Sequence, residues 1–380
     1  MRLRICFLSL VSPYDQKSWS GITYHLFKQI GKYHDVTWPG FLKMSFLFRR
    51  ILWAKERGDR MLNRKFTTHY YLNALFLGIT VKQKIREDDF DCIVVGAGET
   101  ELIACLNTRL PIIFIGDSTF ANMVNYYPWH THLYKNAVRQ GNSIEKKAIQ
   151  KCTHIMYSSE WAANSAITDY GAGRHKISVV DFGANLIKIP PREDVINKPQ
   201  SEKCRLLFLG VQWERKGGDI AYRTFLELRN SGCGSTLTII GCNPPLPVDP
   251  DLTIIPFLDK NNEKDFTALY RILSETDLLL IPTRADCTPI VFSEAAAFGI
   301  PVITTDTGGI TAVIAEGKNG YSLPVEANAL DYCSLILKIW NDKALFRGLI
   351  QSSRGEYDTR LNWDRWVDRF NTMIRKTISA

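Results

Sequence analysis

Two carboxylates separated by seven residues make DCTPIVFSE the first candidate for chemistry in this chain. Asp286 opens the stretch and Glu294 closes it. The apolar run DLLLIP, at 277–282, comes before it and predicts a buried strand. Helical spacing follows and stops at Gly299, a residue type that commonly ends helices. The two acids therefore flank the place where a strand passes through a loop into a helix.

The start of that helix is a predicted anion site. The first turn of a helix has backbone N–H groups without partners in the helix, and these bind anions. Pro289 has no N–H, so the predicted donors are the amides of Thr288, Ile290 and Val291. Acids beside a phosphate site suit a nucleotide-sugar, since one accepts from sugar hydroxyls and the other from ribose hydroxyls. The spacing alone also allows one acid to cap the helix and the other to lie on a solvated face.

A second stretch, FLGVQWERKGGDIAYRTFLELRNSG at 208–232, has a similar form. An apolar strand pattern ends in Gly210, and a helix is expected to start near Gly217. Arg215 and Lys216 stand just before that helix, and cations beside helix N–H groups suit a diphosphate. The alternative is an ordinary basic pair on the surface.

The elements that position these residues are apolar runs that alternate with helical patterns. This alternation is typical of α/β folds with parallel sheets. Ten strands are expected, at 3–8, 91–96, 111–116, 154–159, 177–182, 205–210, 236–241, 252–257, 277–282 and 301–306. We predict two doubly wound Rossmann-like domains facing across a cleft. Their expected bounds are 1–185 for the first domain, 186–203 for a linker without helix or strand, 204–355 for the second domain and 356–380 for a C-terminal amphipathic helix.

Composition limits the functional classes. The net charge of +8 favours anionic partners. Nine cysteines without a C-x-x-C motif argue against zinc and fit reduced thiols in a cytoplasmic protein. The sequence contains no run of 18 apolar residues, so no transmembrane helix is expected. We interpret the first apolar run as a buried strand rather than a signal peptide. VVGAGETE, at 94–101, lacks the third glycine of a nicotinamide fingerprint and is interpreted as a strand-to-helix turn.

Taken together, these stretches resemble the family 4 retaining glycosyltransferases of the GT-B fold. The resemblance rests on D286-CTPIVFS-E294 and K216-GG-D219, and it is strongest over 204–324. Further similar stretches are SWSGITYHL at 18–26, SSEWAANSAITDYG at 158–171 and ISVVDFGANL at 177–186. The resemblance implies transfer of a sugar from a nucleoside-diphosphate-sugar to an acceptor hydroxyl, with retention of configuration. It also implies that the first domain binds the acceptor, that the second binds the nucleotide-sugar, and that the helix at 356–380 returns to the first domain. The turn at 96–101 is then expected to line the acceptor site. No cofactor is implied, and we expect no metal.

The resemblance also assigns roles to individual residues. It implies that Glu294 binds the ribose and that Asp286, with the amides after it, holds the donor sugar. Lys216 would neutralise the diphosphate. Gly21, at the first strand–helix turn, would bring backbone close to the phosphates, and Gly210 lies beside the same donor site.

Four positions depart from the family pattern. Asp286 is one methylene shorter than the usual glutamate, and a Phe-Gly pair is often found where Thr288 is followed by proline. Val211 stands where an arginine is usual, and we hypothesise that Arg215 supplies that charge. Asp117 stands where many members have a histidine near the reacting sugar; it either helps position the substrate or caps a helix starting near Thr119.

The segment 41–66 is basic and aromatic. It predicts either a helix lying on an anionic membrane surface, which would suit a glycan or lipid-linked acceptor, or a helix packed on the first sheet with a solvated basic face. No nucleic-acid-binding module is visible. Two other functional classes remain open: a non-catalytic two-domain sugar-binding protein, and a nucleotide-sugar epimerase or phosphorylase of the same architecture.

Overall fold

The computed structural model describes residues 2–379, and the chain divides into two compact units. The first unit holds residues up to Val180 together with those from Val367 on, and the second spans Asp181–Trp366. Each unit contains one six-stranded sheet in which neighbouring strands are parallel. The prediction of two Rossmann-like α/β domains is confirmed.

The first unit has the strand order β2-β1-β3-β4-β5-β6. Its strands are β1 (Arg4–Leu8), β2 (Asp35–Thr37), β3 (Cys92–Val95), β4 (Ile112–Gly116), β5 (His154–Tyr157) and β6 (Ile177–Val179). Its helices are α1 (Ile22–Gly31), α2 (Phe46–Met61), α3 (Tyr71–Lys84), α4 (Glu101–Ala104), α5 (Phe120–Met123), α6 (Lys135–Lys151) and α7 (Glu160–Thr168). The order reverses between β1 and β3, the kind of switch point at which doubly wound sheets bind ligands.

The second unit has the order β12-β11-β10-β7-β8-β9, which is the Rossmann order. Its strands are β7 (Cys204–Leu209), β8 (Ser235–Ile240), β9 (Leu252–Ile255), β10 (Leu278–Ile281), β11 (Val302–Thr305) and β12 (Gly320–Leu323). Its helices are α8 (Arg192–Ile196), α9 (Gly218–Asn230), α10 (Glu263–Glu275), α11 (Ile290–Ala297), α12 (Ile310–Val313), α13 (Ala329–Asn341) and α14 (Lys343–Thr359). The switch point lies between β7 and β10.

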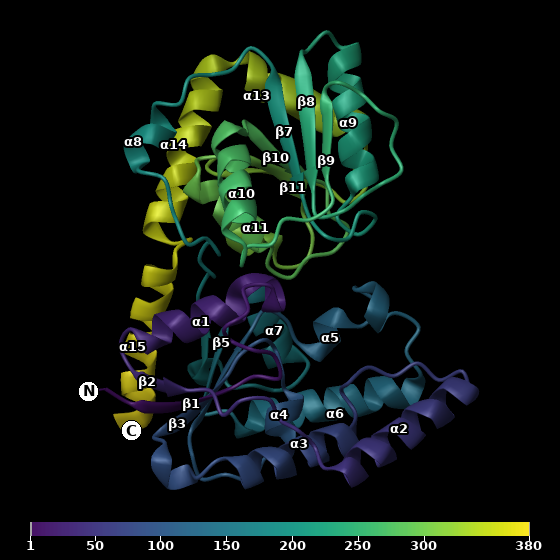
Figure 1. Cartoon of the computed structure of the whole chain (residues 1–380), viewed down its shortest axis with the longest axis vertical. Helices are drawn as coiled ribbons and strands as arrows, with labels where there is room; N and C mark the ends of the chain where they lie inside the picture. Colours follow the sequence, from purple (N-terminus) through teal and green to yellow (C-terminus); the bar gives the residue numbers. More distant parts are fainter. Residues whose placement is uncertain (1, 380) are drawn as a thin grey trace. The chain divides into compact units, whose positions relative to one another are not determined.

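The central strands of the second unit are buried on both faces, which explains their unbroken apolar sequences. Leu207 of β7 packs with α10 and α11, whereas its neighbours Leu206 and Phe208 pack with α9 and α13. Figure 1 shows α9 on one side of these strands and α10 and α11 on the other. Helices on both faces leave the strand ends and their loops as the places where polar side chains gather.

Three expectations about the elements were wrong. The short strands β2 and β12 were missed because each lies at a sheet edge and lacks a long apolar run. The segment 186–203 is not free of regular structure, since it contains α8, which packs on α14 within the second unit. The last helix, α15 (Trp363–Ser379), begins after 356, because the preceding residues complete α14.

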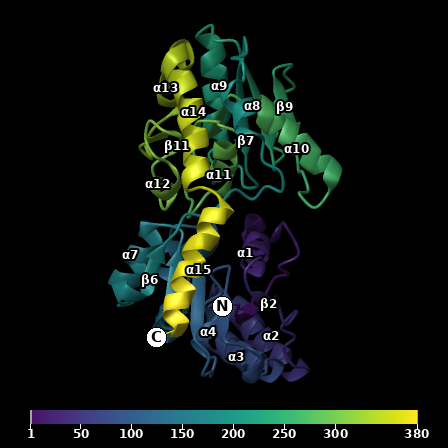
Figure 2. The ribbon, with the colours of Figure 1, turned by 90° about the vertical axis from the view of Figure 1, so that its left-hand side faces the viewer.

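The helix α15 belongs to both units, since it starts in the second and its residues from Val367 on belong to the first. Within the first unit it lies against the segments that lead into β1 and β2, as Figure 2 shows. There His34 Nε2 is 2.9 Å from Asn371 Oδ1, and the ring of Phe370 meets the His34 ring edge to face. The expected return of the last helix to the first domain is therefore observed.

Candidate functional site

The loops after β7 and β10 lie side by side, because these two strands pair in parallel at the switch point. Thr283 Oγ1 donates to the Arg215 carbonyl at 3.2 Å, and Arg284 N donates to the same oxygen at 2.8 Å. Gly217 has φ +72°, and a Cβ atom there would lie 1.9 Å from the Pro282 carbonyl oxygen. Only glycine fits this crossing of two backbones, so the two motifs found in the sequence are held together by their own loops.

Three of the predicted residues form one charged cluster between these loops. The Lys216 ammonium donates to the Asp286 carboxylate, and the Arg215 guanidinium lies 3.9 Å from the same oxygen. Arg215 also donates to the Ala285 carbonyl at 2.5 Å. Lys216 is 8% exposed and Asp286 is 6% exposed. The basic pair is therefore not a surface feature but part of a cluster of two cations and one carboxylate, in which Lys216 and Asp286 are buried.

Gly210 and Val211 are the first two residues after β7. Gly210 lies under the Lys216 side chain, where a Cβ atom would come 3.1 Å from its Cγ. Val211, at the position where an arginine was expected, is 66% exposed. The structure places the Arg215 guanidinium beside Asp286, which is the geometry that the hypothesis of a substituted charge requires.

The start of α11 follows this cluster directly. Pro289 is the N-cap residue and makes no side-chain capping hydrogen bond. Ile290 and Val291 provide first-turn amides, which have no acceptor within the helix. Thr288 is buried beside them. The predicted donor amides thus lie at the carboxyl end of β10, next to the two cations.

Glu294 is fully buried, which rules out the interpretation as a solvated helix face. One of its oxygens accepts from the Lys260 ammonium, which also donates to the Asn185 carbonyl at 3.3 Å. The other oxygen, Oε2, has no hydrogen-bond partner among residues 2–379. Burial raises the pKa of Glu294, and the Lys260 ammonium opposes that rise. A ligand hydroxyl can reach Oε2 only after neighbouring side chains move.

Sequence reasoning missed Lys260. It stands in the polar stretch DKNNEKD, which leads from the loop after β9 into α10 and mixes two lysines with three acids without a recognisable motif. Its importance comes from the fold alone, because β9 and α11 are distant in sequence and the loop after β9 brings the ammonium to the Glu294 carboxylate.

The two remaining predicted residues belong to the first unit. Gly21 is the N-cap of α1 with φ +90°, after two residues, Trp19 and Ser20, that also have positive φ. Asp117 follows β4 and accepts from the Ser118 hydroxyl at 3.2 Å. The cap of α5 is Thr119, which forms a capping box, so the interpretation of Asp117 as that cap is wrong.

The switch point of the first sheet also has an acid that was not singled out. Glu99 follows β3, and both of its oxygens accept from the Leu10 amide in the loop after β1, at 3.1 and 2.9 Å. Burial raises the pKa of Glu99 to about 8. Nearby in sequence, Glu101 lies 3.3 Å from His69 Nε2. The turn after β3, which is predicted to line the acceptor site, is therefore hydrogen-bonded through Glu99 to the loop after β1.

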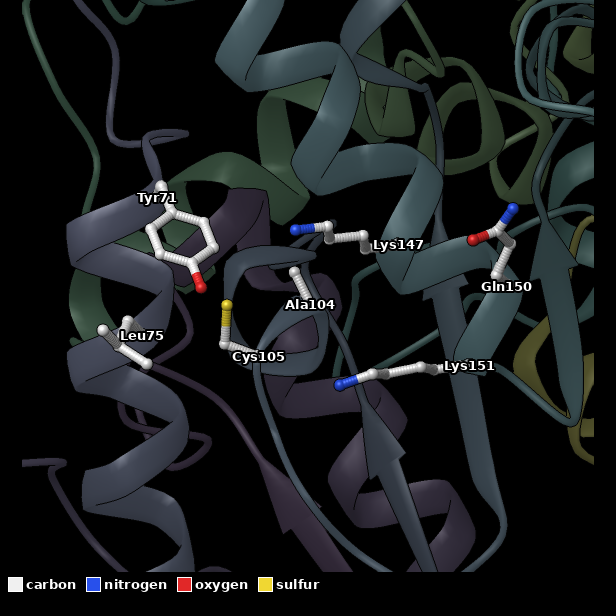
Figure 3. A pocket seen from close by; sticks show the side chains of 7 residues that line it. All are labelled: Tyr71, Leu75, Ala104, Cys105, Lys147, Gln150 and Lys151. Carbon is white, nitrogen blue, oxygen red and sulfur yellow. The ribbon is translucent and has the colours of Figure 1, made fainter.

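A separate cavity of about 480 Å³ lies among α3, α4 and α6 of the first unit. It is lined by Tyr71, Leu75, Ala104, Cys105, Lys147, Gln150 and Lys151. Figure 3 shows the Tyr71 hydroxyl and both lysine ammonium groups directed toward the space around Cys105. None of the predicted site residues lines this cavity.

The described part of the chain contains no ready-made ligand set for a metal ion. No group of three or more His, Cys, Asp or Glu side chains within residues 2–379 is arranged to hold an ion. Over the same residues the nine cysteines are free, and none of the helices is long and apolar enough to cross a bilayer.

Comparison with known families connects this geometry to a named group of proteins. The model for the family "Glycosyl transferases group 1" matches residues 203–342, which include both motifs and Lys260. The second unit is a group 1 glycosyl transferase domain. The group 1 match thus contains the loops after both β7 and β10, with the whole charged cluster.

Curated relatives of the group 1 domain are distant. The glycogen synthase of Mycobacterium tuberculosis is 23% identical over 230 residues, 59% of this chain and 54% of that protein. A D-inositol 3-phosphate glycosyltransferase of Salinispora arenicola is 21% identical over 262 residues, 62% of this chain and 57% of that protein. The chain spans about half the length of the curated relatives it matches.

Solved structures establish the fold of the whole chain. HepE from Anabaena, in complex with UDP and glucose, has a TM-score of 0.65 at 14% identity, with 100% of both chains covered. WaaG, a glycosyltransferase involved in lipopolysaccharide biosynthesis, has a TM-score of 0.60 at 14% identity over 95% of this chain and 96% of its own. The chain has the GT-B fold of these glycosyltransferases.

Proposed function

We propose that this protein is a glycosyltransferase that moves a sugar from a nucleoside-diphosphate-sugar to an acceptor hydroxyl. The observation that supports this most strongly is the charged cluster of Lys216, Arg215 and Asp286 beside the start of α11. It lies at the switch point of a Rossmann sheet, where such folds bind nucleotides, and within the segment that matches the group 1 family.

The reaction breaks the bond between the anomeric carbon and the diphosphate and forms a bond from that carbon to the acceptor oxygen. Negative charge grows on the departing diphosphate. Lys216, Arg215 and the first-turn amides of α11 are arranged to stabilise that charge in a buried site, where electrostatic stabilisation is strongest. When the diphosphate replaces Asp286 as the partner of Lys216, the aspartate becomes available to the donor sugar hydroxyls.

Three finer features belong to this proposal. Retention of configuration rests on the resemblance to family 4 and would follow from same-face attack, with the leaving phosphate oxygen taking the acceptor proton. Metal independence rests on the two cations and the helix amides, which supply the positive charge that a metal would otherwise provide. The transferred group is expected to be a hexose, and Glu294 is expected to bind the ribose.

The acceptor is proposed to be a glycan or lipid-linked molecule of cell-envelope or polysaccharide synthesis, met at the cytoplasmic side of a membrane. Support comes from the segment 41–66, whose helix α2 has no buried residue. Glu99, which joins the loops after β1 and β3, marks the proposed acceptor side of the first unit.

A thermal-shift screen against UDP, GDP, ADP, CMP and dTDP, with and without EDTA, tests the proposal. UDP is the first nucleotide to try, because the HepE structures contain UDP or UDP-glucose. One diphosphate should raise the melting temperature of the wild type, also in EDTA, but not that of Glu294→Ala. No response to any nucleotide would contradict the donor site. Product analysis then separates a new glycoside from an epimerised or phosphate-linked sugar, and its anomeric configuration tests retention.

A further inference from the structure

The cavity among α3, α4 and α6 is lined by hydrogen-bond donors from two different helices. Lys147 and Lys151 lie one turn apart near the end of α6, and both ammonium groups are directed into the cavity (Figure 3). Tyr71, the first residue of α3, directs its hydroxyl group to the same space. Ala104 and Cys105, at the end of α4, also line it. Three donors, of which two carry a positive charge, therefore converge on one space.

The two ammonium groups are held in place without a neutralising acid. Lys151 donates to the Leu106 carbonyl at 2.8 Å, and the Lys147 ammonium lies 4.9 Å from the centre of the Tyr71 ring. Neither lysine forms an ion pair with an acid among residues 2–379. Burial lowers the pKa of Lys151, the Cys105 side chain opposes that effect, and the Lys147 ammonium lowers the pKa further. A bound anion would relieve the repulsion between the two charges.

Helix stability alone does not explain this arrangement. Lysines near the end of a helix stabilise it through its dipole, whichever way their side chains are directed. Lys146 belongs to the same part of α6 and does not line the cavity. The convergence of Lys147 and Lys151 with the Tyr71 hydroxyl is an additional feature, and it points to a ligand.

We propose that this cavity binds a small soluble molecule that carries a phosphate monoester. Such a group has a charge of about −1.5 to −2 at pH 7 and presents three strong acceptor oxygens, which match two ammonium groups and one phenol hydroxyl. A single carboxylate would neutralise only one of the two lysines. The cavity volume of about 480 Å³ leaves room for a small organic body beside Leu75 and Ala104. The site lies apart from the residues proposed for glycosyl transfer, and it does not depend on that reaction.

Cys105 provides a local reporter for this site. It is partly buried, as are Cys233 and Cys242. Burial raises the pKa of all three thiols, and of the three only Cys105 has lysine ammonium groups that oppose the rise. An anionic thiol reagent should therefore react with Cys105 in preference to the other two, whereas a neutral reagent should not show this preference.

The test is labelling of the full chain with dithiobis(nitrobenzoate), a dianionic disulfide, and with dithiodipyridine, a neutral one, and peptide mass spectrometry measures the rate at each cysteine. The ratio of the anionic to the neutral rate should be at least about tenfold higher at Cys105 than at Cys233 and Cys242, because a cationic cavity concentrates anions. Glycerol phosphate should protect Cys105 from both reagents. Sodium chloride at equal ionic strength should not protect it, and succinate, whose two carboxylates are separate, should protect it less.

Three variants separate the site from general surface charge. Lys147→Met should weaken protection by glycerol phosphate about ten- to a hundredfold, because it removes a charged donor. Tyr71→Phe removes a neutral donor and should weaken protection less. Lys146→Met is the matched control and should behave like the wild type. None of these three side chains is buried, so all variants should keep the wild-type melting temperature.

Several results would overturn the proposal. They are equal rate ratios at the three cysteines, equal protection by glycerol phosphate and by sodium chloride or succinate, and undiminished protection in Lys147→Met. Vesicles of phosphatidic acid carry the same phosphate monoester in a lipid headgroup, and protection by these vesicles alone would overturn the assignment to a soluble ligand. Because labelling of Cys105 reports on the cavity itself, it is independent of the UDP response of the donor site, and the two proposals can fail separately.

Discussion

Replacing Lys260 by methionine should make nucleotide binding depend on pH. The Lys260 ammonium holds one oxygen of the buried Glu294 carboxylate and opposes the rise in its pKa that burial causes. Without the ammonium, that pKa rises further and a larger fraction of Glu294 is protonated at neutral pH. A protonated carboxyl loses acceptor capacity for the ribose hydroxyls that Glu294 is proposed to bind. UDP affinity should therefore fall at neutral pH and recover as pH rises through the new pKa.

The size of the effect follows from the bond that is lost. A hydrogen bond to a charged group contributes about 1.5–3 kcal/mol, so UDP affinity should fall by about ten- to a hundredfold at neutral pH. Folding stability should change in the opposite direction with pH. A carboxyl whose folded-state pKa is raised contributes stability below its ordinary pKa, and that contribution is lost as pH rises through the raised value. The Lys260→Met protein should thus bind UDP better and unfold more easily as pH increases.

Isothermal titration with UDP across a range of pH, beside thermal unfolding, measures both trends. Lys264→Met is the matched control, since Lys264 is an exposed lysine of the same region, and it should behave like the wild type. Lys260→Arg should restore most of the affinity, because it keeps the cation. A loss of affinity that does not change with pH, or Lys260→Met binding UDP as tightly as the wild type at neutral pH, would refute the reasoning.

Two further predictions concern the loop after β7. Lys216→Ala should lower kcat by about 10²–10³-fold, because it removes a cation aimed at the leaving diphosphate; initial rates at saturating donor measure this, and an unchanged kcat would exclude the role. Gly217→Ala should destabilise the fold far more than Gly232→Ala, although both glycines have positive φ. An added Cβ meets the Pro282 carbonyl oxygen at 1.9 Å in the first case and nothing within 4 Å in the second. Thermal unfolding compares them, and Gly232→Ala should cost only about 1–2 kcal/mol.

The local pattern of the chain was sufficient for most elements and for the two motifs. Central strands such as β7 and β10 are buried on both faces, so their apolar runs are unambiguous in the sequence. The edge strands β2 and β12 were missed because their sequences, DVT and GYSL, contain no long apolar run, unlike those around the edge strands β6 and β9. Helix α8 is short, and its packing on α14 stabilises it although its sequence has no helical pattern of apolar residues. The sequence of 186–203 therefore predicts a linker.

The types and spacing of Lys216, Asp286 and Glu294 suit a nucleotide-sugar site, but they also allow a helix cap, a solvated face and a surface basic pair. The resemblance to family 4 was needed to prefer the nucleotide-sugar site. The partners of these residues were decided by the tertiary structure. The pairing of β7 with β10 brings Lys216 to Asp286, and the loop after β9 brings Lys260 to Glu294. Contacts between residues distant in the chain depend on strand order, and strand order depends on how whole sheets are buried, which no short stretch of sequence encodes.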